Sequence, residues 1–275
     1  MRTLKLGLAS LIFVSWAASA FAVQTEHVWL APDGTELPFR TDEEILDFLR
    51  TGSVENVATL DIGINASRKI LLEKDGIRAH AIFREVDVER ENAKVGERTY
   101  RRFRDSYRYE CAAYELAKLL GLGNVPPVVI RRIGLREGSV QIWLERTVDE
   151  TSPDFRPANA QQWVNQLWSM YLFDNLIFNV DRNAANVLVD QEQRIWLIDH
   201  TRAFQTVAEL LDDRIVRVDR RLWKKLVALT DHELRLAVSP YLDGLEVRNL
   251  LARRDLLVEH VRELVSQRGE RIVFY

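Results

Sequence analysis

The hydrophobic pattern of this chain changes character near its middle, and it predicts strands before that point and helices after it. In the first region, hydrophobic residues form short runs between turn residues, which is typical of strands, and Lys74-Asp75-Gly76 predicts a hairpin turn. A helix over residues 109–120 interrupts these strands, because its hydrophobic residues recur every three or four positions. The strands that we expect lie at residues 57–64, 69–73, 77–86, 128–133 and 140–144.

Residues 87–107 are polar and rich in arginine, and we expect them to form a loop. Their arginines could recognise an anionic acceptor, or they could form a solvated surface that Glu97 and Asp105 neutralise. Before the first strand, Thr41-x-x-Glu44 is a capping box that predicts a short helix over residues 45–49.

After residue 148 the predicted elements are mostly helices. We expect a linker at 151–159, a long helix at 161–175, short strands at 187–189 and 195–198, and helices from 210 to about 267. The pattern therefore indicates an α+β fold. A β-rich lobe (57–148) follows an N-terminal extension (23–56) and precedes a helical lobe (149–275), and ligands often bind at such a boundary.

The first 22 residues have the features of a secretory signal peptide. Arg2 and Lys5 precede a hydrophobic run that is short for a membrane span, and Ala18-Ser19-Ala20 and Ala20-Phe21-Ala22 both fit a cleavage site. A buried N-terminal helix or an uncleaved anchor is the alternative. We expect an exported protein, periplasmic or secreted, without a membrane span once the signal is removed.

Composition narrows the function classes. The 38 Lys and Arg nearly balance the 41 Asp and Glu, which argues against a strongly basic nucleic-acid-binding protein. Cys111 is the single cysteine, so the sequence excludes an internal disulfide framework and a thiolate-rich metal centre.

Three polar residues, Asp181, Asn186 and Asp199, lie between hydrophobic runs in the second region. Burying a carboxylate is costly unless it meets a cation or a hydrogen-bond network. A hairpin formed by the two short strands would place Asn186 beside Asp199, and such oxygen ligands suit magnesium. The alternative is a capped turn with a purely structural hydrogen-bond network.

The sequence Asp181-Arg182-x-x-x-Asn186, followed by Ile198-Asp199, resembles the catalytic and metal-binding loops of kinase-fold phosphotransferases. It is most similar to the phosphatidylinositol 3-/4-kinase-like branch, while toxin kinases of the HipA type and secretory-pathway protein kinases are more distant analogues. The resemblance implies a two-lobed protein-kinase-like fold that binds ATP and Mg²⁺. It also implies Asp181 as the catalytic aspartate, with Asn186 and Asp199 as the metal ligands.

The resemblance extends to the β-rich lobe. Arg84, at the end of Ala81-Ile82-Phe83-Arg84, takes the place of the family lysine that binds the nucleotide phosphates, although Lys69 or Lys74 could substitute for it. The implied partner of Arg84 is Glu110, because the family glutamate precedes the hydrophobic Ala-x-x-Leu run by about one turn; periodicity alone does not separate it from Glu115.

Two further parts of the nucleotide site follow from the same resemblance. Gly63 and Ser67, in the first hairpin turn, could donate hydrogen bonds to phosphate. Residues 146–148 would form the hinge that contacts adenine.

The loops depart from the family at two places: Asn183 replaces a histidine, and His200-Thr201 replaces the usual Phe-Gly. We expect a phosphotransferase that moves the γ-phosphoryl group of ATP to an unidentified lipid, protein or small-molecule hydroxyl. The alternatives are an exported pseudokinase-type binding or scaffold module and a nucleotidyl transferase.

Overall fold

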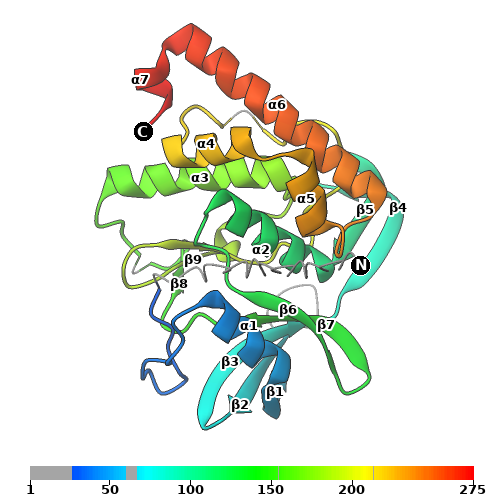
Figure 1. The fold of residues 1–275 in the computed structure, drawn as a ribbon, viewed down its shortest axis with the longest axis vertical. Helices are drawn as coiled ribbons and strands as arrows, with labels where there is room; N and C mark the ends of the chain where they lie inside the picture. Colours follow the sequence, from blue (N-terminus) through cyan, green and yellow to red (C-terminus); the bar gives the residue numbers. More distant parts are fainter. Residues whose placement is uncertain (1–26, 60–66, 154, 213) are drawn as a thin grey trace, which may run out of the picture.

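The computed structural model describes residues 27–59, 67–153, 155–212 and 214–275 (Figure 1). The predicted signal peptide and Gly63 lie outside these residues. Strands dominate one end of the molecule and helices the other, with α2 between them, and the predicted α+β fold is confirmed (Figure 1).

The sheet of the β-rich lobe is antiparallel, and within the described residues it has five strands in the order β1-β2-β3-β7-β6. Asp75 and Gly76 both have positive φ in the turn between β2 and β3, which confirms the predicted hairpin. These strands are β1 (Ser53–Thr59), β2 (Arg68–Lys74), β3 (Ile77–Arg84), β6 (Val128–Ile133) and β7 (Arg136–Ile142).

The first strand begins four residues earlier than its hydrophobic run suggests. It is an edge strand whose described side chains are mostly exposed, so hydrophobic alternation does not mark its start.

Two helices cover the core face of this sheet. Helix α1 (Asp42–Thr51) begins at the predicted capping box and buries Ile45 and Leu49 against the sheet region. Helix α2 (Arg108–Leu120) ends at Gly121, whose φ of 66° is a left-handed conformation that suits glycine. Both helices contact β6 and β7, and α2 also contacts α4 (Arg220–Ala228) and α5 (Asp231–Val238), so it lies between the sheet and the helical lobe.

The prediction of a loop at 87–107 is wrong, because β4 (Asp87–Val95) and β5 (Arg98–Ser106) form an antiparallel ribbon. Ion pairs join the strands, Arg102 with Glu89 and Arg104 with Asp87, and β4 is almost wholly exposed. An exposed ribbon needs no hydrophobic alternation, so the sequence pattern does not reveal it. Figure 1 shows the ribbon rising from the sheet toward α6 (Gly244–Arg268).

The helical lobe contains α3 (Ala160–Ile177), α4 (Arg220–Ala228), α5 (Asp231–Val238), α6 (Gly244–Arg268) and the short α7 (Glu270–Val273). The predicted short strands are confirmed as β9 (Val187–Val189) and β10 (Ile195–Leu197), which pair antiparallel, and β8 (Val148–Asp149) pairs with β9. In the described parts of the chain, no helix is both long enough and hydrophobic enough to span a membrane.

The predicted start of the helices at residue 210 is wrong, since α4 begins only at Arg220. Asp212 and Asp219 accept hydrogen bonds from nearby backbone N–H groups. Aspartates that bond in this way favour turns and helix starts over helix interiors.

Candidate active site

The predicted catalytic and metal-binding residues come from two loops of the helical lobe that are joined to each other. One loop runs from the end of α3 to the 3-10 turn Ala184–Asn186, and the other follows β10. Arg182 joins them, because its Nη1 donates to the carbonyl oxygens of Asn186 (2.7 Å) and Ile198 (2.8 Å). The structure therefore brings the two loops together, as the hairpin prediction requires.

Asn186 and Asp199 offer oxygen atoms at this junction. The amide nitrogen of Asn186 donates to the carbonyl oxygen of Asp181 at 2.9 Å, so its amide oxygen is the atom that could bind a cation. Asp199 has φ 57°, a left-handed conformation that aspartate tolerates, and its side chain is 37% exposed. An amide and a carboxylate oxygen fit Mg²⁺ or Mn²⁺, which prefer such ligands.

The predicted partners Arg84 and Glu110 form a buried ion pair. Their side chains are 6% and 0% exposed, and Arg84 Nη1 lies 3.5 Å from Glu110 Oε1. Arg84 Nε lies 3.9 Å from Asp199 Oδ1, so Arg84 connects the β-rich lobe with the second loop. Glu115 instead pairs with Lys118, and the geometry agrees with the choice of Glu110.

Two atoms of the buried pair face each other without a hydrogen bond. Among the described residues, neither Arg84 Nη1 nor Glu110 Oε1 makes a hydrogen bond, although both atoms are buried. The two atoms lie 3.5 Å apart as an ion pair, and a phosphate oxygen would supply the hydrogen bond that Arg84 Nη1 lacks. Arg84 thus fits a nucleotide phosphate at this position.

The two lysines considered as substitutes for Arg84 have other partners. Lys74 pairs with Asp47 of α1. Lys69 lies 3.8 Å from Glu145 and 4.2 Å above the ring of Trp143. These contacts leave Arg84 as the cation beside Glu110.

His200, which departs from the family pattern, bridges Glu110 to the first loop. Its Nε2 lies 3.0 Å from Arg182 Nη2, and a guanidinium can only donate, so Nε2 accepts. Its Nδ1 lies 3.3 Å from Glu110 Oε2 and therefore carries the hydrogen. Burial disfavours the charged form of Glu110, but Arg84 and the His200 hydrogen bond outweigh it and lower the pKa of Glu110.

Arg182 completes this network, and no role was predicted for it. It donates to both carboxylate oxygens of Asp174 in α3, at 3.0 and 3.1 Å, and both side chains are buried. A continuous chain of charged and polar groups thus runs from Arg84 through Glu110, His200 and Arg182 to Asp174. One sequence signal could have indicated this role. Arg182 lies between hydrophobic runs, and a buried arginine is stable only when it pairs with a carboxylate.

Asp181 has a cationic partner that the sequence did not reveal. Arg202 Nη1 donates to Asp181 Oδ2 at 3.1 Å, and Arg202 Nε donates to Asp105 Oδ2 of β5 at 2.9 Å. Burial raises the pKa of Asp181, Arg202 opposes this effect, and the nearby Asp199 adds to it. Asp181 therefore has a charged partner, even though Asn183 replaces the family histidine.

For Ser67 and the predicted hinge, the structure shows which strands they adjoin. Ser67 directly precedes Arg68, which pairs with Phe83, so Ser67 lies at the Arg84 end of the sheet. At the predicted hinge, Arg146 has φ 55°, and β8 begins at Val148.

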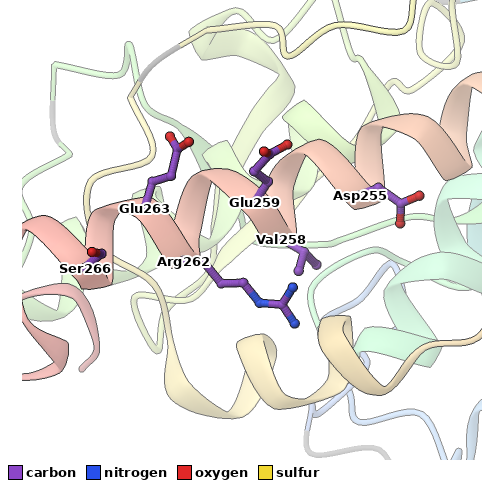
Figure 2. A pocket seen from close by; sticks show the side chains of 6 residues that line it. All are labelled: Asp255, Val258, Glu259, Arg262, Glu263 and Ser266. Atoms are coloured by element: carbon purple, nitrogen blue, oxygen red, sulfur yellow. The ribbon is translucent and has the colours of Figure 1, made fainter.

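A separate groove runs along α6, where it is lined by Asp255, Val258, Glu259, Arg262, Glu263 and Ser266 (Figure 2). All six residues belong to one helix, and none of them is a predicted site residue. The groove is thus not part of the candidate active site.

Comparisons with known proteins support the fold. No protein-family model and no curated protein matches the chain. Among solved structures, hydra Fam20 with sugar matches at 16% identity and a TM-score of 0.68, covering 85% of this chain and 91% of that one. The Golgi casein kinase with Mn/ADP bound matches at 16% identity and a TM-score of 0.63, covering 85% and 78%.

A bacterial kinase also matches. The Helicobacter pylori proinflammatory kinase CtkA is 11% identical with a TM-score of 0.51, and the match covers 82% of this chain and 98% of CtkA. This chain therefore has a kinase-like fold. The narrower resemblance to phosphatidylinositol 3-/4-kinase-like proteins finds no support in these matches.

Proposed function

We propose that this protein is a metal-dependent phosphotransferase that moves the γ-phosphoryl group of ATP to a hydroxyl group. The observation that carries the proposal is the convergence of the buried Arg84–Glu110 pair on Asp199, with Arg84 Nε 3.9 Å from its carboxylate. The kinase-like fold and the Mn/ADP complex of the Golgi casein kinase support a nucleotide and a divalent metal.

The proposal assigns distinct roles to the two lobes. Asn186 and Asp199 would hold Mg²⁺ or Mn²⁺, which when bound would neutralise charge on the phosphate oxygens. Arg84 would bind the α- and β-phosphates through its unsatisfied Nη1, and Ser67 would add a hydroxyl donor. Glu110 would fix the direction of Arg84.

Asp181 would orient the acceptor. The hydroxyl oxygen forms a bond to the γ-phosphorus while the bond from that phosphorus to the β–γ bridging oxygen breaks, and ADP leaves. The hydroxyl proton passes to the Asp181 carboxylate. Burial, which raises the pKa of Asp181, makes this carboxylate a better proton acceptor.

The acceptor and the location also belong to the proposal. A lipid, a protein and a small molecule all offer a suitable hydroxyl. Export to the periplasm or the medium is supported by the N-terminal pattern and by the likeness to a Golgi kinase.

Nucleotide binding is the direct test. MgATP or MnATP should raise the melting temperature of the protein, because a ligand at 100 times its Kd adds about 2.7 kcal/mol to the free energy of unfolding. Asp199→Ala should lose the metal-dependent part of this shift. If neither metal nor nucleotide stabilises the wild-type protein, the proposal is wrong.

The second candidate is a pseudokinase-type binding or scaffold module. Arg84, which is bulkier than the family lysine, favours it. Nucleotide binding without ATP hydrolysis or phosphoryl transfer to any class of hydroxyl would select this alternative.

A further inference from the structure

We propose that Arg202 is the cation that binds the transferred phosphoryl group beside Asp181, and that Asp105 of the β4–β5 ribbon aims it. This inference rests on the proposed phosphotransferase function. It assigns a role both to an arginine outside the predicted motifs and to the ribbon that links the two lobes.

Two hydrogen bonds fix the guanidinium of Arg202. Nε donates to Asp105 and Nη1 donates to Asp181, at 2.9 and 3.1 Å. Within the described residues these bonds leave the Nη2 hydrogens for a ligand, and the side chain is 17% exposed, so a ligand can reach it from solvent. A planar guanidinium held in this way presents a fixed pair of donors to a phosphoryl oxygen.

The charges around Asp181 show why a cation is needed there. Asp105, Asp181 and Asp199 all act electrostatically on Arg202. A phosphoryl group that approaches Asp181 adds further negative charge, and charge repulsion would oppose it without a nearby cation.

The other arginines near the site are already committed. Arg182 is buried, and its guanidinium bonds to Asp174, His200 and two carbonyl oxygens. Arg84 is paired with Glu110, lies beside Asp199 and is assigned to the α- and β-phosphates. Among the described residues, Arg202 is therefore the arginine that contacts the Asp181 carboxylate and still has donors to spare.

The ribbon holds the Asp105 end of this arrangement in place. The N–H of Ser106 donates to the carbonyl oxygen of Thr201 at 2.7 Å. The side chain of Gln205 accepts from the N–H of Arg104 and donates to its carbonyl oxygen. The end of β5 and the segment 201–205 are thus one hydrogen-bonded unit, which fixes the direction of the Arg202 guanidinium.

Binding of a phosphoryl mimic tests the inference without a known acceptor. Titrations of the whole protein with MgADP, in the absence and presence of aluminium fluoride, compare a nucleotide with a planar analogue of the transferred group. The wild-type protein should bind MgADP about tenfold or more tightly when aluminium fluoride is present. Arg202→Gln should bind MgADP within about threefold of wild type but lose this tightening, and Arg202→Lys should recover part of it.

A matched control comes from the same ribbon. Arg101 is exposed on β5, and Arg101→Gln should behave as wild type in both titrations. Arg202→Gln leaves the buried Asp105 without this cation, which could unfold the protein. The double variant Asp105→Asn with Arg202→Gln removes both charges together, and it should also bind MgADP without the tightening.

The outcomes separate this inference from the function on which it rests. Tightening that persists in both Arg202→Gln and the double variant would overturn the role of Arg202, and so would MgADP binding by wild type without any tightening. A wild-type protein that does not bind MgADP would instead contradict the proposed function itself.

Discussion

The charged side chains on the two sides of the candidate site differ in how far they are buried. On the β-rich side, Arg84 and Glu110 are 6% and 0% exposed and belong to a buried network that reaches Asp174. On the helical side, Asp181 and Asp199 are 36% and 37% exposed. The buried charges therefore connect the two lobes, while the carboxylates of Asp181 and Asp199 are only half-buried and solvent reaches them.

The largest expected effect concerns the half-buried helical side. Asp181→Asn removes the proton acceptor and keeps the side-chain volume, so kcat for phosphoryl transfer or ATP hydrolysis should fall by about 10²–10⁴-fold. The Kd for MgADP, measured by calorimetry, should change little, because Asp181 is not assigned to the metal. An equal loss of binding and turnover would show that Asp181 is structural.

On the buried side, a substitution should act on stability. Arg182→Met leaves Asp174 buried without its cation and should lower the free energy of unfolding by about 3–5 kcal/mol, measured by urea denaturation. Arg221 is exposed on α4, and Arg221→Met should stay within about 0.5 kcal/mol of wild type. Equal stability of the two variants would contradict a structural role for the network.

The pH dependence of stability also tests whether the buried charges stabilise the fold. The pKa of Glu110 is lower in the folded protein than in the unfolded chain. The unfolded state therefore binds the proton first, and the stability that ionised Glu110 contributes is present above pH 4.5 and is lost as the pH falls below it. Urea midpoints from pH 7 to pH 3 should fall more steeply for wild type than for Glu110→Gln, and parallel curves would contradict the shift.

The smallest effect is expected on the ribbon. Glu89 is exposed, and its ion pair with Arg102 is screened by solvent. Glu89→Gln should therefore change the free energy of unfolding by at most about 1 kcal/mol, measured by urea denaturation. A loss comparable to that of Arg182→Met would mean that exposed and buried charges of this protein contribute alike.

Several elements could be predicted because their signals are local. The hairpin turn at Asp75-Gly76 and the capping box at Thr41 each depend on residues close together in the chain. The ribbon could not be predicted in this way. Its strands are joined by charged side chains, and Tyr100 and Phe103 pack on Phe178 of the helical lobe, far away in the sequence.

In the candidate site too, residues of short motifs could be predicted, while residues with distant partners could not. Asp181, Asn186, Asp199, Arg84 and Glu110 were proposed from short motifs, and the structure places Arg84 beside both Glu110 and Asp199. Whether they have the assigned roles stays a prediction. Arg182, His200 and Arg202 were not assigned roles from the sequence, because decisive partners lie far along the chain: Glu110 is 90 positions from His200, and Asp105 is 97 from Arg202.

By itself, the sequence determined the order of strands and helices outside the β4–β5 ribbon, and the residue types that suit a divalent cation and a phosphate. Spacing and chain-neighbour chemistry are enough for that. Only the tertiary structure decided which charges are buried, which partners they have, and that a ribbon from the β-rich lobe reaches Arg202 beside Asp181. The physical reason is that the energy of a charge depends on its surroundings in space, and these come from segments far apart along the chain.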